Sequence, residues 1–135
     1  MYIEPKNYWL QGGKVLVAED EMLIAYDIAY SIEEAGGTLI GPVATLANAR
    51  RLCASDQVDA AVLDMNLLDG NAEPLVSELR ALHIPVIVNT AERLPLAFQS
   101  TLPDVLVFAK PTLPDALTEA LGRRLRPEYL PENQI

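Results

Sequence analysis

The chain has 135 residues, half of them hydrophobic, and carries a formal net charge of −9. This length and apolar content predict one folded domain and argue against a disordered segment. The negative charge disfavours nonspecific binding to nucleic acid or to anionic membranes, because such binding needs clustered Lys and Arg. No apolar run is long enough to span a bilayer. Cys53 is the one cysteine, so no internal disulfide can form, and we expect a cytoplasmic protein.

Five short apolar runs, rich in Val, Ile or Leu, recur along the chain. They occupy residues 14–20, 38–44, 59–65, 85–91 and 104–110. Nearly continuous runs of this kind are typical of parallel strands that are covered on both faces. A helical pattern follows each run. The order predicts an α/β fold, a doubly wound five-stranded parallel sheet with helices on both faces and right-handed crossovers.

The first two helices have clear signals at their ends. Isoleucines spaced four residues apart predict a helix over 21–35, and Gly36-Gly37 can end it. Thr45 can cap a second helix that runs to about Ala54, because its hydroxyl can accept a bond from a free backbone N–H.

The later helices are predicted from apolar stripes. The third carries Leu75, Val76, Leu79 and Leu82, and the fifth carries Leu113, Leu117, Leu121 and Leu125. Thr112 and Asp115 resemble a capping box at the start of the fifth helix. Between them, Pro95 and Pro103 predict a short or irregular fourth helix, because proline disrupts helical hydrogen bonding.

Polar residues stand where the predicted strands end. The first strand ends in Glu19-Asp20, the third in Asp64, the fourth in Thr90 and the fifth in Lys110. In an open α/β sheet, ligands bind beyond these carboxyl ends. Crowded carboxylates favour a hard cation such as Mg²⁺, an aspartate can attack phosphorus, and a lysine can hold a phosphoryl oxygen. Each residue alone has an ordinary explanation as a cap, turn or surface residue, but their combination favours phosphoryl transfer.

Four motifs resemble those of the two-component response-regulator receiver domain. They are "VLVAEDE", "VLDMNLLDG", "IVNTA" and "FAKP", and the resemblance covers about residues 13–125. "GPVATLANA" also resembles a stand-alone, alphaproteobacterial group of receivers. The family implies a flavodoxin-like fold with strand order 2-1-3-4-5. We therefore expect an N-terminal extension at 1–13, a receiver domain at 14–125 and a tail at 126–135.

The resemblance also implies roles for individual residues. Asp64 would accept a phosphoryl group from a sensor histidine kinase or a phosphotransfer protein, and Thr90 and Lys110 would contact that group. The implied Mg²⁺ ligands are Glu19, Asp20, Asp64 and the backbone carbonyl of Asn66. Asn66 and Glu92 would tune dephosphorylation. The family further implies a cis peptide between Lys110 and Pro111.

The expected protein is a phosphoacceptor that catalyses only its own phosphorylation and dephosphorylation. With no predicted DNA-binding domain, its output would be contact with a downstream protein, phosphate relay or a homodimer through the fourth helix, fifth strand and fifth helix. Three features depart from the family pattern. Val107 and Thr112 replace common aromatic residues, and the segment between Thr90 and Lys110 is short. These departures put the usual aromatic switch in doubt.

Three other functions would require different residues in these motifs. A receiver-fold binding module that needs no phosphate would show a damaged acidic edge, and the sequence shows none. A phosphatase of the haloacid dehalogenase type needs a second aspartate two residues after the first, where this chain has Asn66. A flavodoxin-like cofactor binder needs a Ser/Thr/Gly-rich loop after the first strand, where "AEDEM" is acidic.

Overall fold

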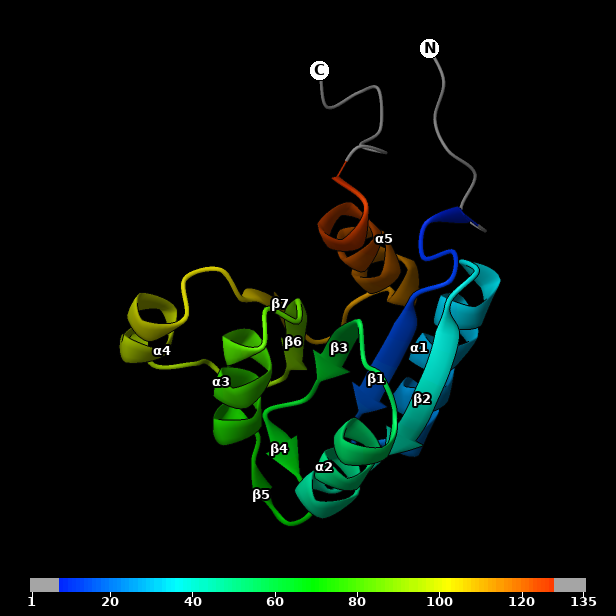
Figure 1. Cartoon of the computed structure of the whole chain (residues 1–135). Helices are drawn as coiled ribbons and strands as arrows, with labels where there is room; N and C mark the ends of the chain where they lie inside the picture. The colour runs from blue at the N-terminus through cyan, green and yellow to red at the C-terminus, as the bar shows by residue number, and fades with distance from the viewer. Residues whose placement is uncertain (1–7, 128–135) are drawn as a thin grey trace.

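The computed structural model describes residues 8–127 and contains one five-stranded parallel sheet. Its strands are β1 (Lys14–Ala18), β2 (Thr38–Val43), β3 (Ala60–Leu63), β6 (Val86–Thr90) and β7 (Leu106–Ala109). They lie in the order β2-β1-β3-β6-β7 (Figure 1), which is 2-1-3-4-5 when only these strands are counted. The predicted fold and strand order are therefore confirmed. A separate antiparallel hairpin, β4 (Asn66–Leu67) and β5 (Gly70–Asn71), was not predicted.

Within residues 8–127, five helices cover the sheet on both faces. They are α1 (Met22–Glu34), α2 (Leu46–Ser55), α3 (Glu73–Ala81), α4 (Leu96–Thr101) and α5 (Pro114–Leu125). Alternate side chains of β1 enter two cores: Val15 and Val17 pack with residues of α1 and α5, whereas Leu16 and Ala18 pack with residues of α2 and α3. Figure 1 shows α4 standing at the edge of the molecule. It has six residues, so the prediction of a short fourth helix is confirmed.

Two predicted helix ends agree with the structure. Gly36 adopts a φ of 86°, and Gly37 N–H donates to the Ile32 carbonyl at 2.9 Å, which closes α1. At the start of α2, the Thr45 hydroxyl accepts a bond from Asn48 N–H at 3.1 Å. Local sequence chemistry thus fixes both ends.

Two predictions about the ends of helices were wrong. Thr112 does not cap α5: its hydroxyl donates to the Ala109 carbonyl at 2.9 Å, and the helix begins after Leu113 with Pro114 as its first residue. Proline is well suited to a first helical position, since it lacks an N–H that would need a partner. Leu113 therefore precedes the helix instead of lying on its apolar stripe, and its side chain is exposed. Leu82 is exposed as well, because α3 ends one residue before it.

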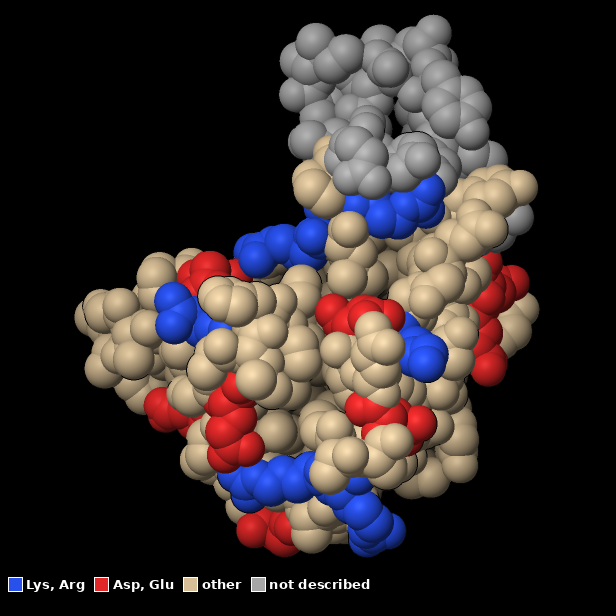
Figure 2. Space-filling view, in the orientation of Figure 1, with Lys and Arg blue, Asp and Glu red and all other residues tan. Residues whose placement is uncertain are grey.

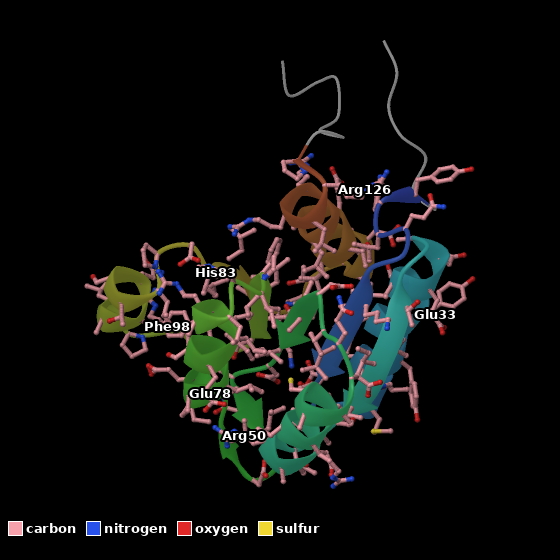
Figure 3. All side chains as sticks on the ribbon, viewed as in Figure 1. Glu33, Arg50, Glu78, His83, Phe98 and Arg126 are labelled. Atoms are coloured by element: carbon pink, nitrogen blue, oxygen red, sulfur yellow. The ribbon has the colours of Figure 1, made fainter. Side chains whose placement is uncertain are left out.

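The β4–β5 hairpin fastens the loop after β3 to α2. Asp69, at its tip, accepts bonds from Leu46 N–H at 2.6 Å and Ala47 N–H at 3.1 Å. A carboxylate is favourable there, because the start of a helix carries free N–H groups and partial positive charge. An Arg50–Glu78 ion pair of 2.7 Å joins α2 to α3 farther along (Figure 3).

Part of the predicted N-terminal extension packs against the domain. Leu10 is 0% exposed within the core formed with α1 and α5, and its N–H donates to the Ala35 carbonyl at 2.9 Å. Trp9 lies against Gly122 of α5, where a β-carbon would stand 2.9 Å from the Trp9 carbonyl oxygen. Residues 8–13 therefore close the gap between the two helices on this side of the sheet.

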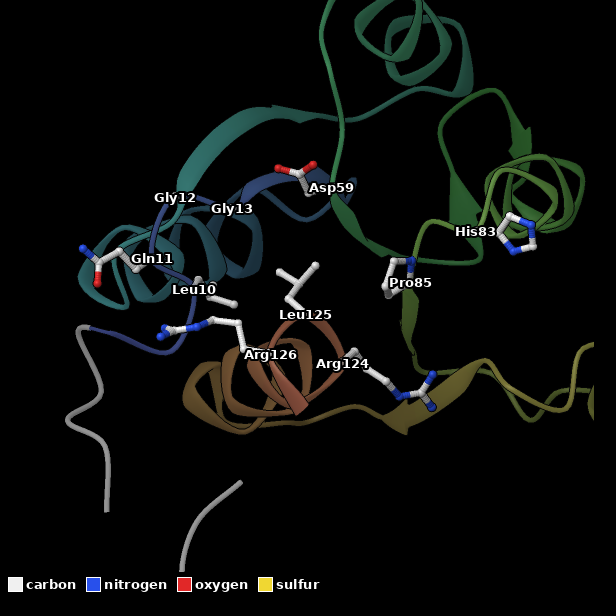
Figure 4. A pocket seen from close by; sticks show the side chains of 10 residues that line it. All are labelled: Leu10, Gln11, Gly12, Gly13, Asp59, His83, Pro85, Arg124, Leu125 and Arg126. Atoms are coloured by element: carbon white, nitrogen blue, oxygen red, sulfur yellow. The ribbon is translucent and has the colours of Figure 1, made fainter. Parts of the chain in front are cut away.

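A hollow of about 450 Å³ lies at the amino ends of the strands (Figure 4). Its walls come from the 8–13 segment, from the starts of β3 and β6, and from the end of α5. It lies at the opposite end of the sheet from the acidic residues described below. Basic and acidic side chains are interspersed on the face shown in Figure 2. Within residues 8–127, no helix is long and apolar enough to cross a bilayer.

Candidate functional site

Asp64 lies at the carboxyl edge of the sheet, directly after β3. This strand is central, because it pairs with both β1 and β6. The Asp64 N–H donates to the Ala18 carbonyl at 2.9 Å, and Oδ1 accepts a bond from Asn66 N–H at 3.1 Å. The carboxylate is almost fully buried. Backbone contacts on both sides thus hold its position.

Lys110 reaches this carboxylate from the end of β7. Its Nζ lies 2.8 Å from Asp64 Oδ2, 2.9 Å from Glu19 Oε1 and 3.0 Å from Glu21 Oε1. The side chain is 8% exposed, so the ammonium group is enclosed by its carboxylate partners. The Lys110–Pro111 peptide is cis, as the family resemblance implied. The structure therefore brings together residues from three separate strand ends.

Four carboxylates gather at this edge. Glu19, Asp20, Glu21 and Asp64 each offer one oxygen, and these oxygens all lie within 4.8 Å of one another. Hard oxygen ligands are the kind that Mg²⁺ prefers. Among residues 8–127, no other cluster of three or more His, Cys, Asp or Glu side chains is placed to hold a metal ion. The predicted role of the Asn66 carbonyl stays a prediction.

The two buried carboxyl groups have different protonation tendencies. Burial raises the pKa of Glu19 to about 7, and the nearby Asp64 carboxylate adds to the rise. Burial opposes ionisation of Asp64 too, but hydrogen bonds from Lys110 and from the Asn66 N–H outweigh it and hold its pKa below the usual value. Burial likewise disfavours the Lys110 charge, yet its carboxylate partners raise the Lys110 pKa. Of these two carboxyl groups, Asp64 is therefore the one that more readily stays ionised.

Thr90 and Glu92 lie at the same edge, one strand away. Thr90 is buried at the end of β6, and its Oγ1 accepts a bond from Glu92 N–H at 3.3 Å. Within the described chain, no hydrogen bond joins the Thr90 hydroxyl to Asp64 or Lys110. However, Lys110 N–H donates to the Thr90 carbonyl at 3.0 Å, so the two residues are linked through backbone.

No protein-family model matches the chain. No curated protein sequence matches it either. Among solved structures, SdrG of Sphingomonas melonis has a TM-score of 0.70 and 30% sequence identity, with 84% of this chain and 97% of SdrG covered. The response regulator PhyR of Brucella abortus has a TM-score of 0.72 and 28% identity over 90% of this chain. The chain belongs to the response-regulator receiver family.

Two further observations define the receiver's relation to these structures. The chain spans about half the length of PhyR, since the match covers 51% of the Brucella protein. A CheY-like receiver of Methanospirillum hungatei has a TM-score of 0.76 but 19% identity, so it supports the fold alone. The activities and partners of the longer proteins therefore do not transfer directly to this receiver.

The receiver's departures from the family pattern are visible in the structure. Val107, on the edge strand β7, is 37% exposed and short. Phe108 points to the other face of the sheet and packs against the core that α1 and α5 share. Because neighbouring residues of a strand face opposite sides, Phe108 cannot take the place of an aromatic residue at 107 without a change of register.

Glu21 is the residue that sequence reasoning gave no role. It follows Glu19 and Asp20 directly, but it also stands at the start of α1, where acidic residues are common for reasons of helix stability. The signal that could have found it is the run of three acids after a buried strand. Its direction, toward Lys110, depends on a contact between residues 89 positions apart.

Proposed function

We propose that this receiver accepts a phosphoryl group on Asp64. The observation that carries the proposal is the buried Asp64 carboxylate, bonded to Lys110 Nζ at 2.8 Å inside a group of four acids. Lys110 holds the Asp64 carboxylate in its ionised, nucleophilic form and stands where it can also reach an oxygen of the incoming group.

The transfer is a nucleophilic substitution at phosphorus. One Asp64 carboxylate oxygen attacks the phosphorus of a phosphohistidine, and an oxygen–phosphorus bond forms while the phosphorus–nitrogen bond breaks. The electron pair of the broken bond stays on the imidazole nitrogen of the donor. Water later attacks the same phosphorus, which releases inorganic phosphate and restores the Asp64 carboxylate.

The donor set also fits Mg²⁺. Glu19, Asp20 and Asp64, with the backbone carbonyl of Asn66, would hold the ion, which supplies positive charge to the transferring group. Lys110 and the Thr90 hydroxyl would donate hydrogen bonds to the phosphoryl oxygens, and both would change position when the group is present. Burial of Asp64 would limit the access of bulk water to the acyl phosphate.

Phosphorylation can be tested with small-molecule donors. The protein is incubated with acetyl phosphate or phosphoramidate and Mg²⁺ and then weighed by mass spectrometry. We expect one phosphate, no phosphate in Asp64→Asn, and no phosphate when EDTA removes the metal ion. Asp56→Asn is the matched control, since Asp56 is exposed at the end of α2. Phosphate that persists on Asp64→Asn would refute the assignment to Asp64. A folded parent that takes up no phosphate would instead favour a binding module that needs none.

The proposed output surface lies beside α4. Leu96 is 83% exposed, and Leu94 and Leu96 line a hollow on this surface, whereas Phe98 is buried. Thr90 and Lys110 bracket the segment, so their movement toward a phosphoryl group would shift it. We infer that this surface contacts a downstream protein or a second copy of the chain, and that a sensor histidine kinase or phosphotransfer protein supplies the phosphate. A cytoplasmic location stays a prediction.

A further inference from the structure

Glu21 makes a contact that the proposed phosphorylation chemistry does not use. It is the residue that precedes α1, yet its side chain accepts no hydrogen bond from the backbone of that helix. Its Oε1 lies instead 3.0 Å from Lys110 Nζ. The Glu21 side chain is 59% exposed and that of Lys110 is 8% exposed. Glu21 therefore approaches the enclosed ammonium group from the solvent side.

Lys110 has no spare proton in this arrangement. An ammonium group has three protons to donate, and Glu19, Glu21 and Asp64 together accept them. A bond to a phosphoryl oxygen therefore requires that one carboxylate be released. Release of buried Glu19 or Asp64 would leave a desolvated carboxylate with a backbone N–H but without its charged partner, which is costly. Glu21 can turn into water, so it is the partner that yields.

Glu21 also changes the charge of the site. It brings a fourth carboxylate within 4.8 Å of the other three, opposite the single Lys110 ammonium. Added negative charge attracts a divalent cation and repels a phosphoryl group. The two effects of Glu21 thus have opposite signs for the two ligands.

We propose that Glu21 is a positioning residue that competes with the phosphoryl group for Lys110 while it strengthens cation binding. The inference rests on the proposed function of Asp64. Glu21 thereby lowers the occupancy of the phosphorylated state at a given donor concentration. It acts through the contact with Lys110 and through its charge, and it does not touch phosphorus.

Titrations of Glu21→Gln followed by NMR amide shifts test this proposal, first with Mg²⁺ and then with beryllofluoride, a phosphoryl mimic, at saturating Mg²⁺. We expect beryllofluoride to bind about three- to tenfold more tightly and Mg²⁺ about two- to fivefold more weakly than in the parent. Glu33→Gln is the matched control, because Glu33 is an exposed residue near the other end of α1. It should leave both affinities unchanged.

The outcomes separate this proposal from the proposed function. If the parent binds beryllofluoride but Glu21→Gln equals Glu33→Gln in both titrations, the Glu21 proposal is wrong and phosphorylation at Asp64 stands. Weaker beryllofluoride binding in Glu21→Gln would also overturn it, because Glu21 would then assist the phosphoryl group. A folded parent that binds no beryllofluoride at saturating Mg²⁺ would remove the proposed function and this inference together.

Discussion

Leu10→Ala should destabilise the whole domain, although Leu10 lies outside the predicted receiver boundary at residue 14. Its side chain is fully buried in the core that α1 and α5 share. Its N–H also bonds to the Ala35 carbonyl, and the neighbouring Gly13 carbonyl accepts a bond from Thr38 N–H at 2.7 Å. The substitution removes an isopropyl group from a site that backbone bonds hold in place.

The expected loss follows from the burial of that group. Truncation of a buried leucine to alanine costs about 2–5 kcal/mol, which includes the lost transfer free energy and the remaining cavity. The 8–13 segment lines an open hollow, so it can relax toward the core in spite of its backbone bonds. The expected loss is therefore about 2–3 kcal/mol, at the lower end of this range. For a domain of this size, such a loss lowers the melting temperature by roughly 6–15 °C.

Urea unfolding and thermal unfolding, both followed by circular dichroism, measure this loss. Leu96→Ala is the matched control, because the same group is removed from an exposed position of α4, and we expect a change within about 0.5 kcal/mol. Equal stabilities of Leu10→Ala and Leu96→Ala would refute the conclusion that residues 8–13 are part of the folded domain.

Four other outcomes can be measured. Asp20→Asn should weaken Mg²⁺ binding and phosphorylation together, and an unchanged magnesium titration would contradict its role as a ligand. Asn66→Met combined with Glu92→Leu should slow dephosphorylation several-fold, a barrier change of about 1–2 kcal/mol, and equal half-lives would end that claim. Backbone N–H groups of α2 lower the pKa of Asp69, so its stabilisation is present above about pH 4 and is lost as the pH falls through the lowered folded-state pKa. Asp69→Ala should therefore lower the melting temperature at pH 7, and its difference from the parent should shrink as the pH falls below about 4. A constant difference would argue against the ionised cap. Amide hydrogen exchange should change in 91–108 when beryllofluoride binds, and silence there would exclude this surface as the output.

Much of the fold could be predicted because its signals are local. Continuous apolar runs identified all five strands of the large sheet. The central strands β1, β3 and β6 are buried along nearly their whole length, whereas the edge strands β2 and β7 are partly exposed. Thr45 and Gly36 marked helix ends through the hydrogen bonds and the φ angle that these residue types favour. The site followed in the same way, because Asp64 and Lys110 stand at strand ends that a parallel sheet brings to one edge.

The features that were missed depend on partners far away in the sequence. Leu10 looks like part of an appended terminus until α1 and α5 enclose it. Asp69 looks like a turn residue, yet its carboxylate binds the start of α2. The capping box at Thr112 failed for a local reason, because Pro114 favoured a later start of α5 and the Thr112 hydroxyl found a partner in the preceding strand.

Gly122 shows how a close approach between chain segments can limit attempts to improve the protein. Within a helix, glycine is about 1 kcal/mol less favourable than alanine, so a stability engineer would choose Gly122→Ala. Here the new methyl group would stand 2.9 Å from the Trp9 carbonyl oxygen, which is too close. Alanine would gain helical propensity but push the 8–13 segment away from α5. The glycine that weakens α5 is therefore the residue that lets the 8–13 segment pack closely against it. Gly122→Ala would strengthen the helix and lose that packing.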